Sequence, residues 1–214
     1  MQIEERPFEL DLELLRSGLS TDTVRMEPRS PGLHLSDLLR DLENVIIKPG
    51  QRKLDADQTP EEIATRNRYF EMGFLWEQVM EAAFKQRQVD GLDPRKFLRQ
   101  MEVQFDGVYS TIDAIHIPDW RVIETKLTFR SARRAALDCI EFEFWSWFAQ
   151  LRWNCLAHST RLASLLVLFV NGTYAPSVPM TKRFDVVFAE EELLDNQRMV
   201  KQHEAVMRKH GRLK

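Results

Sequence analysis

Residues 108–126 carry the side chains with the clearest potential for chemistry. They read as two β-strands joined by a Pro-Asp turn, with Asp113 on the first strand and the acid-x-lysine pair Glu124 and Lys126 on the second. Because strand side chains alternate between faces, Glu124 and Lys126 share one face, and pairing of the strands would bring Asp113 beside Glu124. Burying two carboxylates and an ammonium among apolar residues costs free energy unless the charges are stabilised. A divalent cation would stabilise them, so the stretch predicts a metal site.

The predicted ligands are oxygen atoms, which suit hard cations such as Mg²⁺ and its substitute Mn²⁺. They are the carboxylates of Glu77, Asp113 and Glu124 and the backbone carbonyl of Thr125. Phosphodiester hydrolysis needs a water molecule activated near neutral pH and stabilisation of the charge that develops around phosphorus. The metal would supply both, and Lys126 would orient or deprotonate the water or stabilise the developing charge.

A structural alternative exists for the same residues. Asp113, Glu124 and Lys126 would form a cross-strand salt bridge on an exposed face, worth ~0.2–1 kcal/mol. Taken alone, Glu77 is better explained as a surface glutamate that favours helix formation and has no catalytic role. The apolar residues Trp120 and Val122 beside the acid-x-lysine pair argue against the alternative for the strands.

Glu77 requires a preceding helix to position it. Thr59 as N-cap, Pro60 at the first helical position and Glu62 as the partner of a capping box predict a helix over residues 59–88. Gly73 lies one turn before Glu77, at a point where a backbone or ligand can approach closely.

Residues 1–58 show the weakest secondary-structure pattern. They are interpreted as an N-terminal helical extension to a nuclease-type domain over residues 59–214. Within the extension, residues 33–47 predict a short helix with Ser36 as N-cap.

The remaining elements predict an α/β fold of mixed topology, with a central mixed sheet flanked by helices. A meander of three strands, with a hairpin turn at Asp106-Gly107, precedes a long helix that carries Gln150, and further strands follow. The predicted strands are residues 101–105, 108–117, 121–127, 165–170 and 184–188, and the two later helices are residues 131–158 and 190–209.

Composition narrows the function further. Of the 214 residues 43% are hydrophobic, enough for a sizeable core, and no apolar run reaches transmembrane length. The N-terminus lacks the pattern of a signal peptide, so we expect a cytoplasmic protein with no membrane partner. The net charge of −3 argues against a wholly basic nucleic-acid binder and leaves room for a local basic groove, for which Arg130, Arg133 and Arg134 are candidates.

Several classes of site are excluded by missing motifs. No glycine-rich phosphate loop occurs, so an ATP-driven motor is not expected. The two cysteines, Cys139 and Cys155, are predicted in one helix, too far apart for a disulfide and too few for an iron–sulfur cluster.

The set Gly73-x-x-x-Glu77, Asp113, Glu124-x-Lys126 and Gln150 resembles the motifs of the PD-(D/E)XK nuclease superfamily over about residues 60 to 190. The resemblance is closest to the RecB-like and phage lambda-exonuclease-like branches. It implies an αβββαβ restriction-endonuclease-like core. It also implies Glu77, Asp113 and Glu124 as metal ligands, Lys126 as the catalytic lysine and Gln150 as a catalytic-site residue.

Some positions depart from the family pattern. Ile112 replaces the proline before the motif aspartate, and Trp153 stands where a tyrosine is expected after the glutamine. In lambda-exonuclease-like members an N-terminal arginine and serine bind the terminal phosphate, and Arg29 and Ser36 would correspond. The predicted DNA-binding residues are therefore Ser36, Arg29, Arg130, Arg133, Arg134 and Trp153.

The expected function is a Mg²⁺-dependent DNA nuclease, most simply an exonuclease acting on DNA ends in phage-type recombination or DNA processing, in the host cytoplasm if phage-encoded. One alternative is an endonuclease for structure-specific cutting or for trimming DNA during virus-head completion. Another is a catalytically silent DNA-binding or structural protein on a nuclease fold. Besides DNA, the expected partners are further copies in a ring-like homo-oligomer, or a recombination or packaging protein.

Overall fold

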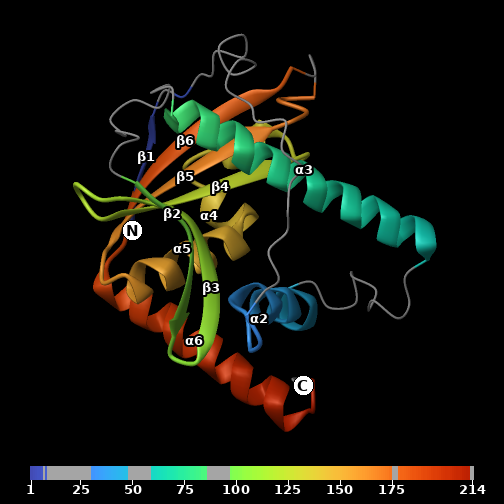
Figure 1. The fold of residues 1–214 in the computed structure, drawn as a ribbon, viewed down its shortest axis with the longest axis vertical. Helices are drawn as coiled ribbons and strands as arrows, with labels where there is room; N and C mark the ends of the chain where they lie inside the picture. Colours follow the sequence, from blue (N-terminus) through green and yellow to red (C-terminus); the bar gives the residue numbers. More distant parts are fainter. Residues whose placement is uncertain (7, 9–29, 48–58, 86–96, 175–177, 213–214) are drawn as a thin grey trace.

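A mixed sheet forms the centre of the molecule in the computed structural model, which describes residues 1–6, 8, 30–47, 59–85, 97–174 and 178–212. Within these residues the sheet has six strands, in the order β1-β6-β5-β4-β3-β2, and helices flank it (Figure 1). The elements are β1 (Gln2–Arg6), α2 (Leu35–Leu42), α3 (Pro60–Lys85), β2 (Phe97–Phe105), β3 (Val108–His116), β4 (Arg121–Thr128), α4 (Ile140–Glu143), α5 (Trp145–Ala157), β5 (Leu162–Phe169), β6 (Met180–Val187) and α6 (Glu190–Lys209).

The strand pairing is mixed because β4 and β5 run parallel while the other neighbours are antiparallel. A parallel pair needs a crossover connection, and α4 and α5 supply it. The predicted α/β class and the order of helix, three strands, helix and strand are confirmed. The Asp106-Gly107 turn joins β2 to β3, with both residues at positive φ, as a tight hairpin of this kind requires.

Alternation along β4 divides the core into two layers. Val122 faces α5 and packs in one cluster with Phe148 and Leu165, whereas Ile123 faces α3 and packs with Trp76 and Met80. Both faces of β4 are therefore covered, and any polar side chain on it is held between helices.

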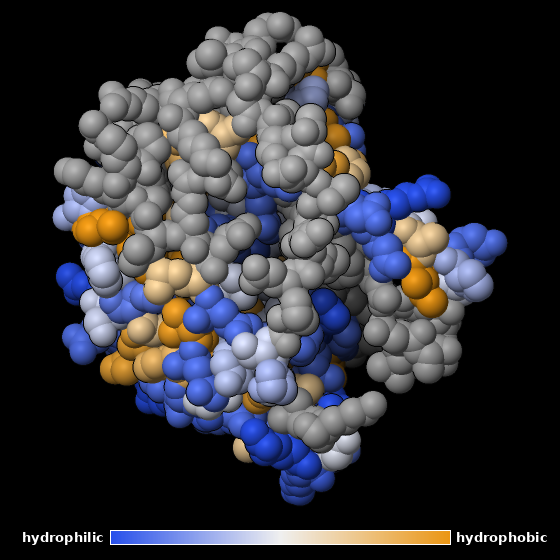
Figure 2. Space-filling model, viewed as in Figure 1, coloured by the Kyte–Doolittle hydropathy of each residue, from blue (hydrophilic) through white to orange (hydrophobic). Residues whose placement is uncertain are grey.

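Helix α3 begins as predicted. The Thr59 hydroxyl accepts from the N–H of Glu62, and the Glu62 carboxylate accepts from the N–H of Thr59, which completes the capping box. The predicted end near residue 88 lies outside the described residues. The N-terminal half of α3 projects beyond the sheet, with hydrophilic and hydrophobic side chains next to one another on it (Figures 1 and 2).

The single long helix predicted over residues 131–158 is wrong. The segment instead forms a 3-10 turn at Ala132–Ala135, then α4 and α5. Phe144 separates the two helices, with φ −121° and ψ 37°, outside the helical region. Its buried ring stacks on Trp147, while Arg130 donates to the carbonyl of Glu143. Packing at this corner therefore overrides the apolar periodicity that predicted one helix.

The helix predicted over residues 33–47 is α2 followed by a π-helical turn at Glu43–Ile47. Its N-cap is His34, so the prediction of Ser36 as N-cap is wrong. The His34 carbonyl receives the first turn's N–H groups, and Ser36 lies exposed inside the helix.

Strand β1 was not predicted. It pairs with β6 at the edge of the sheet, and its side chains are mostly exposed, so its sequence lacks the apolar alternation that marks a half-buried strand. Cys139 precedes α4 and Cys155 lies in α5, so the two do not share a helix, and both are free thiols. No helix among the described residues is long and apolar enough to cross a membrane.

Helix α6, which has its predicted bounds, closes the molecule against α2. His203 pairs with Asp41 at 2.8 Å, and Arg212 also contacts Asp41. Leu38, Val200 and neighbouring apolar residues pack beneath these pairs.

The two layers predict contrasting effects for two phenylalanines of the α4–α5 segment. Phe148 is 0% exposed, so Phe148→Ala should lower the free energy of unfolding by about 3–5 kcal/mol. Phe142 is 85% exposed, so Phe142→Ala should change it by no more than about 0.5 kcal/mol. Urea titration of the two variants measures both values, and an equal loss would contradict the packing of α5 described above.

Candidate functional site

The candidate site lies where β3 and β4 part. These strands pair from His116 opposite Arg121 to Ala114 opposite Ile123, and the ladder stops there. At the next position, Oδ2 of Asp113 accepts the backbone N–H of Thr125 at 2.6 Å and its hydroxyl at 2.8 Å. The side chain thus replaces the missing strand partner. Beyond this point β3 continues with β2 as a hairpin that swings away from β4 (Figure 1).

Glu124, Lys126 and Gln150 form a closed hydrogen-bonded group on the α5 face. Nζ of Lys126 donates to Oε1 of Glu124 at 2.5 Å and to Oε1 of Gln150 at 3.0 Å. Nε2 of Gln150 donates to the same Glu124 oxygen at 2.8 Å. The predicted group of Glu124, Lys126 and Gln150 is therefore brought together, from two elements that lie far apart in sequence.

Glu124 is 1% exposed, and its second oxygen, Oε2, is buried with no hydrogen-bond partner in the described structure. A buried carboxylate oxygen without a partner costs free energy, because water no longer solvates it. Such an atom calls for a ligand that is a hydrogen-bond donor or a cation.

Glu77 joins the group from α3, on the other layer. Burial raises the pKa of Glu77 to about 7, with the negative charge of Asp113 adding to the effect and Lys126 opposing it. Burial likewise raises the pKa of Glu124 to about 8, again assisted by Asp113 and opposed by Lys126. Carboxylates perturb one another in this way only when they are close neighbours. Glu77 is therefore near enough to Asp113, Glu124 and Lys126 for their charges to act on one another.

Lys126 stays charged in this environment. Burial alone would lower its pKa, but the negative charges of Glu124, Asp113 and Glu77 outweigh burial, and the pKa is raised. Its side chain as a whole is 22% exposed, while Nζ is held by Glu124 and Gln150.

The acids do not form a preorganised metal-binding site among the described residues. No group of three or more His, Cys, Asp or Glu side chains in the described residues is arranged to hold a metal ion. The chemistry of the set nevertheless fits a hard cation, because it offers oxygen donors only, one of them the unpartnered Oε2 of Glu124. The raised pKa values of Glu77 and Glu124 point the same way, since a nearby cation would relieve their mutual repulsion.

The other predicted residues have varied positions. Trp153 is fully buried and packs edge-to-face on Phe105, which makes it a core residue rather than a DNA contact. Ser36 lies on α2 apart from the acid group, and Arg29 lies outside the described residues.

The three arginines after β4 lie at the α4 corner. Arg130 is partly buried over the ring of Phe144, Arg134 pairs with Glu143, and Arg133 is exposed.

Sequence reasoning considered only the carbonyl of Thr125 and missed its hydroxyl and N–H, which hold Asp113. Alternation was the available signal, because Thr125 faces away from the Glu124–Lys126 face, toward the gap left by β3.

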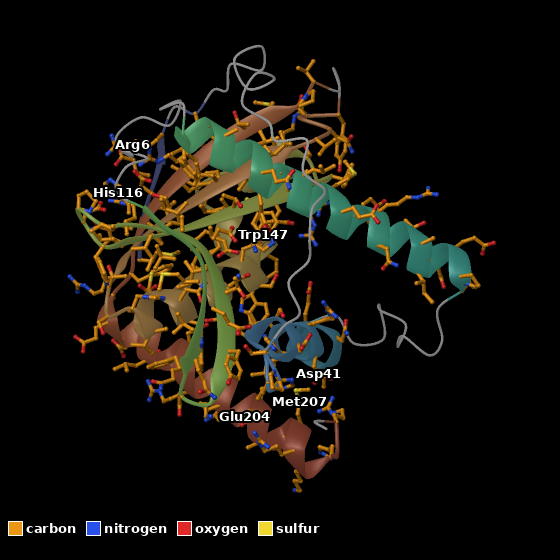
Figure 3. The ribbon with its side chains drawn as sticks, viewed as in Figure 1. Arg6, Asp41, His116, Trp147, Glu204 and Met207 are labelled. Carbon is orange, nitrogen blue, oxygen red and sulfur yellow. The ribbon has the colours of Figure 1, made fainter. Side chains whose placement is uncertain are left out.

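His116 lies at the end of β3 and has a structural role. Its Nδ1 pairs with Asp119 at 2.6 Å at the turn end of the hairpin, away from Trp147 on α5 (Figure 3). Asp119 also accepts from Arg121, which fits a residue of the turn that is no metal ligand.

Comparison with known proteins adds little. No family model and no curated protein matches the chain. Among solved structures it resembles the crystal structure of SSO0001, with a TM-score of 0.44 and 14% identity over 89% of this chain and 83% of that one. A likeness this weak carries no argument about function.

The raised pKa of Glu124 predicts how stability varies with pH. Between the ordinary pKa of 4.5 and the folded value of about 8, the unfolded chain ionises this carboxyl while the folded protein keeps it protonated. The folded protein therefore binds more protons than the unfolded chain. The stability that Glu124 contributes is complete below pH 4.5 and is lost as the pH rises to about 8. The loss is about 1.4 kcal/mol per pKa unit.

Glu124→Gln should remove the part of the decline that Glu124 causes and leave the part below about pH 7 that Glu77 causes, whereas Glu71→Gln, at an exposed position on α3, should leave both in place. Urea titrations of both variants across this pH range measure the slope. An unchanged slope in Glu124→Gln would show that Glu124 ionises normally in the folded protein.

Proposed function

We propose that the protein is a Mg²⁺-dependent deoxyribonuclease that hydrolyses phosphodiester bonds, acting on DNA ends. The observation that carries the proposal is the convergence of Glu77, Asp113 and Glu124 with Lys126 and Gln150 where β3 leaves β4. A salt bridge needs one acid for one base. Three carboxyl groups around a single ammonium in a largely buried place, two of them with raised pKa values, are a costly arrangement that a structural role does not explain.

The acids are suited to hold the cation. Glu77, Asp113 and Glu124, with the carbonyl of Thr125, are the proposed ligands, and Oε2 of Glu124 is the atom with no other partner. Bound Mg²⁺ would lower the pKa of a coordinated water and offset the charge that develops on the phosphate. Asp113 is the most rigidly placed of the acids, because both of its bonds come from Thr125 on the central strand.

The role of Lys126 narrows to charge stabilisation and orientation. Its raised pKa keeps the ammonium protonated near neutral pH, so it donates hydrogen bonds and has no free lone pair to take a proton. Glu124 and Gln150 fix the position of Nζ, from which the ammonium would donate to a phosphate oxygen. Gln150 thus acts by positioning Lys126 and Glu124.

The resemblance to PD-(D/E)XK nucleases supports the same assignment of roles to these five residues. An endonuclease, or a DNA-binding protein without catalysis, would be built on the same scaffold. These two are outcomes that the following experiment separates.

Purified protein is mixed with linear and with circular duplex DNA, in Mg²⁺ or in chelator. We expect loss of linear DNA in Mg²⁺ only. Cutting of circles would identify an endonuclease, and retardation without cleavage in either condition would overturn the catalytic proposal.

Lys126→Ala should reduce the rate of cleavage by at least about 100-fold, the range expected for a group that stabilises transition-state charge. Lys209→Ala removes a lysine from the exposed end of α6 and should cleave at the wild-type rate. Circular dichroism of both variants checks that they fold, and wild-type activity in folded Lys126→Ala would contradict its role.

Metal binding is testable without activity. If Mg²⁺ binds the acids in the folded state only, a concentration 100-fold above Kd stabilises the protein by about 2.7 kcal/mol. For a domain of this size that raises Tm by about 5–10 °C. The shift should disappear in Glu124→Gln and in Asp113→Asn but persist in Glu71→Gln. Equal shifts in all four proteins would place the bound metal elsewhere.

A further inference from the structure

Three aromatic rings gather just past the end of β4, outside the acid group. The ring of Phe129 lies 5.1 Å from that of Tyr69 on α3, at an angle of 52°. The hydroxyl of Tyr174, in the loop after β5, donates to the carbonyl of Phe129 at 3.0 Å. Tyr69 is 54% exposed and Tyr174 is 55% exposed. Three segments far apart in sequence therefore meet at one place, where Tyr69 and Tyr174 are exposed and Phe129 is half-buried.

Tyr174 is held there against a conformational cost. Its φ is 71°, in the left-handed region that bulky side chains avoid, at a cost of about 1–3 kcal/mol. Its N–H donates to the carbonyl of Asn171 at 2.8 Å, and the Asn171 side chain donates to the same Phe129 carbonyl at 3.1 Å. The loop is thus tied to Phe129 at two points. Burial of the ring does not offset the cost, because more than half of it remains exposed.

Gly73 lies on α3 between Tyr69 and Glu77, at four-residue intervals that place the three on one side of the helix. Glycine inside a helix costs about 1 kcal/mol relative to alanine. Packing does not require it here, since a Cβ added to Gly73 would meet no described atom within 4 Å. As far as the described residues go, the glycine therefore leaves space beside the helix between the exposed tyrosine and the acid group.

The spacing of these features suits a polynucleotide strand. Eight helical residues separate Tyr69 from Glu77, about 12 Å. Three extended residues separate Phe129 from Lys126, about 10 Å. The rings therefore lie about 10–12 Å from the acid group along each element, a distance that a few nucleotides of an unpaired strand would span.

We propose that Tyr69, Phe129 and Tyr174 stack on unpaired bases of the substrate, and that its backbone passes over Gly73 to the acid group. This rests on the proposed nuclease function and specifies its substrate: a DNA end that is single-stranded over a few nucleotides. Ring faces stack on base faces, and in a duplex each base face is already covered by its neighbours, so only an unpaired strand can use them. The exposed Arg133, in the segment that follows Phe129, is available to a phosphate of the same strand.

The test is binding, measured in chelator so that no cleavage occurs. A short fluorescein-labelled single strand and a blunt duplex of the same sequence serve as probes for fluorescence anisotropy. Wild-type protein should bind the single strand more tightly than the duplex. Tyr69→Ala and Tyr174→Ala should each weaken single-strand binding by about 5- to 150-fold, the measured range for loss of one stacked base.

Gly73→Leu separates function from folding. Leucine is a better helix former than glycine and meets open space, so Tm should stay equal or rise. The side chain would fill that space, and single-strand binding should fall at least as far as in Tyr69→Ala. Phe142→Ala, which removes a more exposed aromatic ring from α4, should bind as wild type.

The proposal is overturned if folded Tyr69→Ala and Gly73→Leu bind the single strand as wild type does, or if wild type binds the blunt duplex equally tightly. The proposal would also be overturned if these variants lost binding to a peptide or protein ligand and still bound the single strand as wild type does. Failure of the nuclease function itself looks different: no DNA is cut in Mg²⁺, while the single strand is still bound through the rings.

Discussion

The hydrogen bonds from Thr125 to Asp113 are the constraint on which the rest of the site depends. They end the β3–β4 ladder after three residue pairs and replace a strand partner with a carboxylate. An antiparallel pair that continued would have closed this edge of β4. Because it stops, side chains from α3 on one layer and α5 on the other can meet β4 at the same point. The hairpin β2–β3 is freed to run toward α2 and α6, against which it packs.

The site is costly to the fold, and the cost is local. Glu124 is buried with one unpartnered oxygen, Glu77 and Glu124 both hold raised pKa values, and a single lysine offsets three acids. A buried group of this kind persists only where its surroundings are over-determined. Here the surroundings are β4 between two apolar clusters, with parallel β5 on its other edge. Two residues outside the acid group also carry a local cost. Gly73 is a glycine inside a helix, and Tyr174 is a bulky residue with a positive φ.

Local rules predicted much of this arrangement. Alternation placed Glu124 and Lys126 on one face, the capping box placed the start of α3, and the Asp106-Gly107 pair placed the β2–β3 turn. Each depends on residues within a few positions of one another, so the sequence contains the whole cause. The break at Phe144 was missed for the opposite reason. The Phe144 ring packs in the core beside Phe169, and Arg130 donates to the carbonyl of Glu143 at the break. Both contacts join segments that are distant in sequence.

By itself, then, the sequence predicted which side chains would form the candidate site: an acid on α3, an acid on β3, an acid and a lysine on β4, and a glutamine on α5. It also determined the class of fold, because hydrophobic period and turn chemistry are local properties. Only the tertiary structure decided where β3 leaves β4, which oxygen of Glu124 is left without a partner, and that Lys126 keeps its proton. These follow from burial and from charges brought together across the sheet, and no local pattern encodes how far water is excluded from a side chain. The stretch from Asp113 to Lys126 is a site because of what α3 and α5 place around it.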